Sequence, residues 1–311
     1  MISAIVPVFN GRQHLARLLD SLDAQTRRAE EILVIDNGSS DGAPELARER
    51  GARVIAMGRN TGFAPAVNCG IREARGEWLA ILNSDVVLAP DYLEKLASAG
   101  APFATGRILS PRGTLDATFD LTSRAGTTWR AGAGMTDGPP FDAAREIASP
   151  PFTAVLIRAE VFQRAGLLEE RFESYLEDAE FGLRCARLGI AGRYMPEARA
   201  VHAGSATLGR WHPDTVRRIA RNQLFLASMH LSRKCWWAVL MGQLLWGVVA
   251  LRHGTGLAWL SGKWEGLRGF RFASLDESRL GQVLQDNERF IRMASRDRYW
   301  KLYFLLTDGA K

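Results

Sequence analysis

The chain has 311 residues, of which 47% are hydrophobic and 24% charged, and its formal net charge is +6. This ordinary globular composition excludes a fibrous or disordered chain. Three widely spaced cysteines exclude a disulfide scaffold or a paired-cysteine zinc module and suit a reducing cytosol, and no secretory signal peptide is expected at the N-terminus.

The first hundred residues alternate between strand and helix patterns. Short apolar runs predict strands, and apolar residues at helical spacing predict the helices between them. In chain order we expect a strand at 2–8, a helix around 15–22, a strand at 32–35, a helix at 44–50, a strand at 53–56, a helix at 62–74 and a strand at 78–82. Pro7 restricts the first strand to a sheet edge or its own strand end. Strands separated by helices predict an α/β fold with a mainly parallel sheet flanked by helices.

The rest of the chain divides into two parts. Residues 100–150 are rich in Gly, Thr, Pro and Ala and are expected to form loops with short strands, followed by a strand and helix within 152–165 and a helix at 177–188. Residues 211–311 read as helical and hold 16 Lys and Arg against 8 Asp and Glu, with seven of the nine tryptophans. We therefore predict two domains, 1–210 and 211–311. The basic, Trp-rich part fits nucleic acid or an anionic membrane, or a solvated face around a Trp-rich core.

Polar residues follow three of the predicted strands. They are Asn10 after the first strand, Asp36 after the second, and Asn83 to Asp85 after the strand at 78–82. Ligands of open parallel sheets bind outside the carboxyl ends of the strands. Asp36 is suited to a base or ribose hydroxyl, or to an ordinary cap or turn. Asp85 with its oxygen-bearing neighbours suits Mg²⁺ or Mn²⁺ carrying a diphosphate, although turns use the same residues.

Two common nucleotide-binding patterns are missing. The first strand is not followed by G-x-G-x-x-G, so a dinucleotide-dependent oxidoreductase is not expected, and no P-loop sequence is present.

Taken in order, the motifs resemble those of the family 2 inverting glycosyltransferases with the GT-A fold. The resemblance covers about residues 2–205 and rests on Ile5–Asn10, Val34–Gly42, Asn60–Ala64 with Asn68 and Gly70, Leu82–Asp85, Phe172–Arg184 and Val201–His202. Within that family the chain looks most like bacterial rhamnosyltransferases that build cell-surface polysaccharide.

The resemblance implies roles for individual residues. A nucleotide-sugar pocket is implied for Pro7, Phe9, Asn10, Asp36, Asn60, Gly62, Phe63, Asn68, Asn83, Ser84 and Asp85. Asp85 is implied as a metal ligand, with His202 as a second ligand. Asp178, or less favourably Glu177, is implied as the general base, and the alternative is that these acids only stabilise the first turn of a helix. Asn83 departs from the commoner D-x-D motif, which leaves one formal charge fewer for the metal.

The resemblance thus implies an inverting transferase that moves L-rhamnose from dTDP-L-rhamnose to a lipid-linked or polysaccharide acceptor with help from a divalent cation. Another donor, such as a galactofuranosyl or hexosyl nucleotide, is the first alternative. A sugar nucleotidyltransferase and a non-catalytic scaffold are the others. Nucleic acid is not expected as a partner, and the oligomeric state, including a homo-oligomer, stays open.

An apolar segment in the C-terminal part bears on location. Cys235–Leu251 would form a helix about 25 Å long, which is shorter than the roughly 30 Å hydrocarbon core of a membrane. Basic residues flank it, and five tryptophans suit an interface: Trp236, Trp237, Trp246, Trp259 and Trp264. We expect this helix to lie among lipid headgroups, placing a cytoplasmic protein on the inner face of the membrane near a polyprenyl-diphosphate-linked acceptor. The alternative is a helix packed on the rest of the protein or on a partner.

Overall fold

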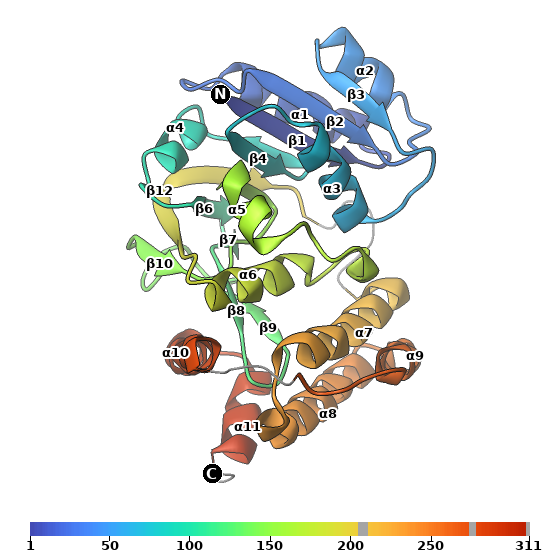
Figure 1. The fold of residues 1–311 in the computed structure, drawn as a ribbon, viewed down its shortest axis with the longest axis vertical. Coiled ribbons are helices and arrows are strands. Elements are labelled where there is room, and N and C mark those ends of the chain that lie inside the picture. Colours follow the sequence, from blue (N-terminus) through green and yellow to red (C-terminus); the bar gives the residue numbers. More distant parts are fainter. Residues whose placement is uncertain (205–210, 274–277, 309–311) are drawn as a thin grey trace.

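Strands and helices alternate through the first part of the chain in the computed structural model, which describes residues 1–204, 211–273 and 278–308 (Figure 1). The elements confirm the predicted order and are β1 (Ile2–Val8), α1 (Arg12–Asp23), β2 (Glu31–Asp36), α2 (Ala43–Glu49), β3 (Arg53–Ala56), α3 (Phe63–Glu73) and β4 (Trp78–Leu82). Pro7 lies next to the end of β1, which is an inner strand of the sheet, so its missing N–H interrupts little of the ladder. The domain boundary expected at residue 210 lies outside the described residues.

The following part contains more regular structure than predicted. Its elements are β5 (Val86–Leu88), α4 (Tyr92–Ala97), β6 (Phe103–Leu109), β7 (Leu115–Ala117), β8 (Asp120–Thr122), β9 (Thr128–Arg130), β10 (Arg145–Ile147), β11 (Ala154–Arg158), α5 (Ala159–Ala165), η1 (Glu170–Phe172), α6 (Glu177–Arg187) and β12 (Gly192–His202). The expectation of loops and short strands at 100–150 is wrong for β6, a buried seven-residue strand. The eleven-residue β12 was not predicted either. Its inward positions include small residues such as Ala198 and Ala200, which give a weak strand signal.

The central sheet combines a parallel half with a mixed half. Its strand order is β10-β12-β6-β11-β4-β1-β2-β3, with β5 beside β12 and β7 beside β6. Strands β4, β1, β2 and β3 are parallel, whereas β11 runs antiparallel to both β4 and β6. Because β11 starts beside the end of β4, residues just before β11 lie at the same rim as those just after β4.

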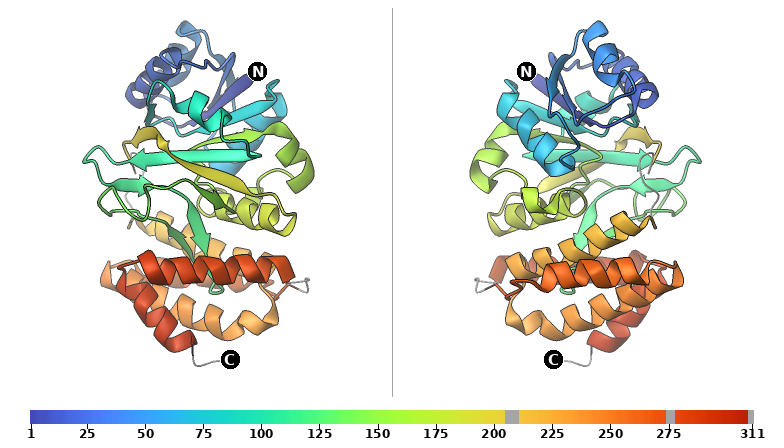
Figure 2. Two further views of the ribbon diagram at one scale, coloured as in Figure 1. Left: turned by 90° about the vertical axis from the view of Figure 1, so that its left-hand side faces the viewer. Right: turned by 90° about the vertical axis from the view of Figure 1, so that its right-hand side faces the viewer.

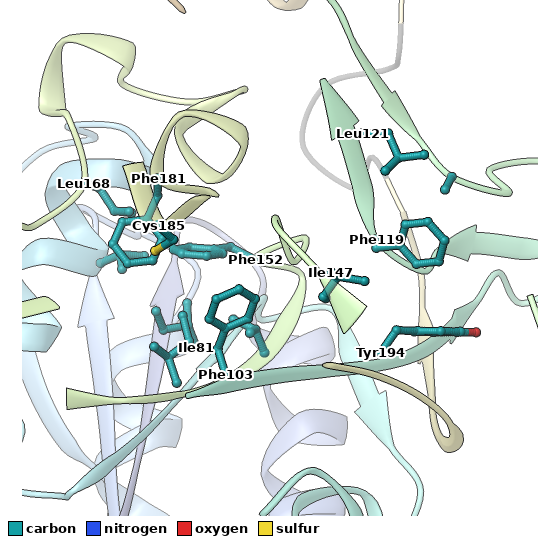
Figure 3. Close-up of a cluster of buried hydrophobic side chains, with 14 of the residues drawn as sticks. Ile81, Phe103, Phe119, Leu121, Ile147, Phe152, Leu168, Phe181, Cys185 and Tyr194 are labelled. Carbon is teal, nitrogen blue, oxygen red and sulfur yellow. The ribbon is translucent and has the colours of Figure 1, made fainter. Parts of the chain in front are cut away.

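Each face of the sheet has its own hydrophobic core. Side chains of β1 alternate between the two, since Ile5 belongs to one cluster and Ala4 and Val6 to the other. Helices α1, α2 and α4 cover one face, and α3, α5 and α6 cover the other. In the cluster that contains Ile5, Phe181 and Cys185 of α6 lie beside Phe152, whose ring centroid is 5.6 Å from that of Phe181 (Figure 3). This packing sets where α6 begins relative to the rim of the sheet.

The C-terminal helices form a layer at one end of the molecule (Figure 2). They are α7 (Pro213–His230), η2 (Arg233–Cys235), α8 (Trp236–Arg252), α9 (Gly256–Leu267), α10 (Ser278–Ala294) and α11 (Arg298–Thr307). Aromatic residues of α11 and Ile291 of α10 share a buried cluster with Phe119 and Phe141, so one core joins this layer to the preceding part. Hydrophobic burial therefore stabilises the two parts together.

Helix α8 has a protein-facing side and an exposed side. Gln243 points inward, where its Nε2 donates to the carbonyl of Ala125 at 2.8 Å and its Oε1 accepts from the buried Lys263. Lys263 also donates to the carbonyl of Ala220 at 2.7 Å, so it joins α7, α8 and α9. The segment Arg233–Arg252 is, by length and composition only, the single helix among the described residues that could cross a membrane, with one third of its apolar window buried.

Exposed apolar side chains lie on α8 and also on α9 and α11, which both pack against α8. We call this surface the apolar face, and its exposed residues are Trp236, Leu240, Leu244, Val248, Leu251, Leu257, Leu260, Trp264, Leu267, Leu302, Leu305 and Leu306. Of the five tryptophans considered above, Trp236 and Trp264 are exposed. Trp237, Trp246 and Trp259 are half-buried against the protein.

Candidate active site

The loops after β1 and β2 are joined at the rim of the sheet. Val8 pairs with Asp36, and Asn10 follows with a left-handed backbone (φ 49°). Asn10 Oδ1 accepts from Ser40 N at 2.9 Å, and Asp36 Oδ1 accepts from Ser39 N at 2.9 Å. This hydrogen bond fits the interpretation of Asp36 as a turn residue. Only Oδ1 of Asp36 takes part in it. Next to these two loops, Pro7 is buried and Phe9 is half-buried.

The Asn60–Phe63 segment lies against the loop that follows β2. Asn60 Oδ1 accepts from Gly62 N at 3.0 Å, and Gly62 has φ 94°, where a side chain is strained and where a Cβ would lie 2.7 Å from the carbonyl oxygen of Glu173. Phe63 then begins α3. Asn37 bridges the two segments, because its Nδ2 donates to the carbonyl of Gly62 at 2.9 Å and its Oδ1 accepts from Thr61 N at 3.0 Å. This bridging role of Asn37 was not predicted from the sequence.

Asn68 is buried within α3 and bonds inside the protein. Its Oδ1 accepts from Leu168 N at 2.9 Å, and its Nδ2 donates to Leu168 O at 2.9 Å and to Glu170 Oε1 at 3.0 Å. Asn68 therefore ties α3 to the segment that leads into α6.

Asp85 and His202 meet at the end of β4, as the sequence predicts. Strand β12 ends at His202 opposite Val86, and this brings His202 Nε2 to 3.1 Å from Asp85 Oδ1 and 3.5 Å from Asn83 Nδ2. Ser84 lies against Gly11 of the first loop. Asp116 of β7 accepts on the other side of the imidazole, 2.8 Å from Nδ1. Burial alone would lower the pKa of His202, but its hydrogen bonds with Asp116 and Asp85 outweigh burial and raise the pKa to about 9.

These residues fit a divalent cation as two protein ligands. Neighbouring ligands of an octahedral cation with bonds of about 2.1 Å lie about 3 Å apart, and the Asp85–His202 distance matches that spacing. A cation would have to displace the Nε2 proton that the raised pKa favours, and the bond from Nδ1–H to Asp116 would then leave the Nε2 lone pair for the metal, as in a metal-binding histidine. Within the described ranges, no group of three or more His, Cys, Asp or Glu residues could hold a metal. Further ligands would have to come from water or a bound phosphate, as Mg²⁺ sites commonly use.

A second acidic group lies where α6 begins. Asp178 Oδ2 is 3.1 Å from Arg130 Nη2 of β9, and Asp178 Oδ1 accepts from Ala179 N at 2.8 Å. Arg130 Nε is also 3.3 Å from Asp120 Oδ1 of β8. Burial raises the pKa of Asp120 to about 7, because the charge of Arg130 only partly offsets it.

Glu177 differs from its neighbour Asp178. Its carboxylate is buried, and Oε2 has no hydrogen-bond partner within the described part of the chain. Burial and the adjacent Asp178 carboxylate raise the pKa of Glu177 well above its usual range. Asp178 is thus the ion-paired carboxylate of the two and Glu177 the one whose protonated form is favoured.

The Asp85–His202 pair is linked to Asp178 through the residues that precede β11. Asn83 N donates to Thr153 O at 2.9 Å, and the preceding Phe152 N lies 3.5 Å from Asp178 Oδ2. A short connection through residues 152–153 therefore joins the end of β4 to the start of α6.

Asp116, Asp120 and Arg130 were missed by the sequence analysis. They lie in the region expected to be mostly loops, on strands of three residues. One signal was available: residues 115–120 alternate apolar and polar side chains, which places Asp116 and Asp120 on one side of an extended segment. Nothing local indicated that this segment lies at the end of β4.

The fold and the site together define a glycosyltransferase. Residues 3–101 match the family described as "Glycosyl transferase family 2", and residues 78–262 match "Glycosyl transferase family group 2". Since the second match covers more than half of the chain, this protein belongs to the family 2 glycosyltransferases and is a glycosyltransferase. The predicted fold class, family and enzyme class are confirmed, and the sugar nucleotidyltransferase alternative is wrong.

The relatives include enzymes of surface-polysaccharide synthesis. The chain is 27% identical over 286 residues to an "N-acetylglucosaminyl-diphospho-decaprenol L-rhamnosyltransferase" of Mycobacterium tuberculosis, covering 81% of this chain and 91% of that protein. It is 33% identical over 229 residues to an O-antigen biosynthesis protein of Myxococcus xanthus, covering 66% of this chain and 17% of the relative. The resemblance to bacterial rhamnosyltransferases is thereby confirmed.

Solved structures support the fold. GalNAc-T7 with UDP, GalNAc and Mn²⁺ aligns over 99% of this chain and 56% of its own, with a TM-score of 0.63 and 14% identity. A mannosyltransferase from Pyrobaculum calidifontis with GDP-Man and Mn²⁺ aligns over 99% of this chain and 79% of its own, with a TM-score of 0.52 and 16% identity. At these identities the likeness concerns the fold alone.

Proposed function

We propose that this glycosyltransferase moves L-rhamnose from dTDP-L-rhamnose, with inversion, to a polyprenyl-diphosphate-linked saccharide. The observation that carries the proposal is the joining of two groups at one rim, the Asp85–His202 pair and the Asp178–Arg130 pair. The Asp85–His202 pair suits a diphosphate with its cation, and the Asp178–Arg130 pair suits the hydroxyl of an acceptor. The sugar and the lipid-linked acceptor follow the name of the rhamnosyltransferase relative, which the chain covers over 91% of its length, and the dTDP carrier follows the family resemblance.

The proposed reaction is a single displacement at the anomeric carbon. Asp178 takes the proton of the acceptor hydroxyl, whose oxygen forms the new bond as the bond to the diphosphate breaks. Asp178 suits this role better than Glu177, because it is ion-paired with Arg130 whereas the raised pKa of Glu177 favours a protonated acid. Asp85 and His202 would hold Mg²⁺ or Mn²⁺, which when bound would offset the negative charge of the leaving diphosphate.

The donor pocket is proposed along the loops after β1, β2 and β3. Asn10 and Asp36 would receive the base and ribose, and the segment from Asn60 to Phe63 would line the rest. Asn83 and Ser84 would lie beside the diphosphate next to Asp85. This position of the donor pocket agrees with the general rule that ligands bind outside the carboxyl ends of parallel strands.

The apolar face supports a peripheral position on the cytoplasmic side of a membrane. It presents leucines and two tryptophans on three adjoining helices, with exposed Arg233, Arg252 and Arg268 at its margins, which fits an anionic lipid surface. The hydrogen bonds of Gln243 to Ala125 and Lys263 favour a helix lying on the protein over one crossing the membrane. Such docking would bring a lipid-linked acceptor to the enzyme.

A donor comparison tests the proposal. The full-length protein with Mn²⁺ is offered dTDP-L-rhamnose, UDP-galactofuranose and hexosyl nucleotides, each with polyprenyl-diphosphate N-acetylglucosamine. We expect transfer from dTDP-L-rhamnose with inverted anomeric configuration. Faster transfer from a galactofuranosyl or hexosyl donor, or retention of configuration, would contradict it.

A further inference from the structure

Three of the four residues that precede Glu177 and Asp178 have an unusual backbone. Glu173, Tyr175 and Leu176 have φ of 58°, 74° and 69°, and Leu176 is directly followed by Glu177. Residues with a Cβ rarely adopt positive φ, and such conformations persist only where the surroundings hold them. We call Glu173–Leu176 the 173–176 loop.

Two buried residues of α7 bond to this loop and its preceding turn. Asn222 Nδ2 donates to the carbonyl oxygens of Phe172, Ser174 and Tyr175 at 2.9, 3.0 and 2.8 Å. Asn222 is fully buried, and its Oδ1 accepts from Arg221 Nε at 3.0 Å.

Arg221 completes the arrangement. Its Nη2 donates to the carbonyls of Arg171 and Phe172 at 3.2 Å each, and its Nη1 pairs with Glu173 Oε1 at 3.1 Å. Backbone carbonyls that receive several buried donors are fixed in position, because moving them would leave these groups unpaired.

The same loop also bonds to the proposed donor pocket. Glu173 O accepts from Ala64 N at 2.9 Å, and Ser174 Oγ accepts from Phe63 N at 3.0 Å. Gly62 approaches Glu173 so closely that a Cβ has no room. The loop therefore connects the start of α3 to the start of α6, which carries Asp178.

We propose that Asn222, supported by Arg221, is a positioning residue for glycosyl transfer. It acts through the 173–176 loop and sets both the Asp178 carboxylate and the beginning of α3. The C-terminal helices would thus affect sugar transfer, because α7 positions the 173–176 loop, in addition to presenting the apolar face. This inference rests on the proposed function insofar as Asp178 is the base.

The first test replaces Asn222 with Asp, which keeps the volume but cannot donate to the three carbonyls. We expect kcat to fall about 100-fold, the order expected from a displacement of about 1 Å at a reacting group, with a higher KM for the donor. Amide hydrogen exchange should become faster in two distant peptides together, 60–66 and 171–180. Arg221→Lys is the milder second variant, since it retains charge near Glu173 and removes bonds to Arg171 and Phe172.

The matched control is Gln25→Glu. Gln25 is also a buried amide that donates to two carbonyls, those of Ser21 and Ala89, but on the opposite face of the sheet. It should lower the melting temperature similarly without affecting kcat. Unchanged exchange in both peptides, or faster exchange with kcat as in Gln25→Glu, would overturn the proposal. A wild-type protein that transfers no sugar would instead contradict the proposed function, while the exchange comparison would still decide whether Asn222 holds the loop.

Discussion

Asp116 offers a graded test of the metal assignment, because it contacts His202 and is not one of the two proposed ligands. Its Oδ2 lies 2.8 Å from His202 Nδ1 and holds the ring with Nε2 facing Asp85. Loss of such an outer carboxylate typically lowers metal affinity 10- to 100-fold, or about 1.4 to 2.8 kcal/mol. Asp116→Asn retains an uncharged acceptor and should cost about tenfold, whereas Asp116→Leu retains none and should approach 100-fold.

The measurement is Mn²⁺ binding to the full-length protein at fixed pH, followed by electron paramagnetic resonance of the free ion. Asp137→Asn is the control, because Asp137 pairs with Arg107 on the neighbouring β6 and does not contact His202. Parallel titration of the transfer rate with Mn²⁺ should show the same order of variants. Wild-type affinity in Asp116→Leu, or an equal loss in Asp137→Asn, would refute the argued role of Asp116.

Three further outcomes follow from the site and the apolar face. Asp85→Ala should abolish transfer and weaken nucleotide-sugar binding while the circular dichroism spectrum stays that of the wild type, and full activity in excess chelator would contradict this. Asp178→Asn should retain donor binding and lose about 10²–10⁴-fold in turnover, the usual contribution of a general base; if Glu177→Gln is inactive and Asp178→Asn active, the base is Glu177. Leu244→Glu should reduce sedimentation with anionic liposomes, whereas Leu188→Glu, at a similarly exposed leucine outside the apolar face, should not. Equal sedimentation of both variants would argue against docking by that face.

The sequence by itself determined the elements and the residues that follow them in the first part of the chain. Apolar runs and helical spacing are local patterns, so β1 to β4 and their helices were predicted with nearly the right bounds. The positions of Asn10, Asp36 and Asp85 follow, because the parallel strands end at one rim. The pairing of Asp85 with His202 came from a resemblance between ordered motifs and not from periodicity.

Only the tertiary structure decided what surrounds these residues. Asp116, Asp120 and Arg130 reach the site because β6 and β12 pair far along the chain and carry β7 to β9 with them, and no local pattern encodes such a register. The hydrogen bonds of Asn222 to the 173–176 loop and to Phe172 likewise join residues 47 to 50 positions apart, because α7 packs against this segment. For α8, the composition predicted an apolar helix. Which side of it packs on the protein and which stays exposed is seen only in the structure, where buried Gln243 bonds to Ala125. Local propensity selects elements, whereas buried polar groups must find partners wherever the packed chain brings them.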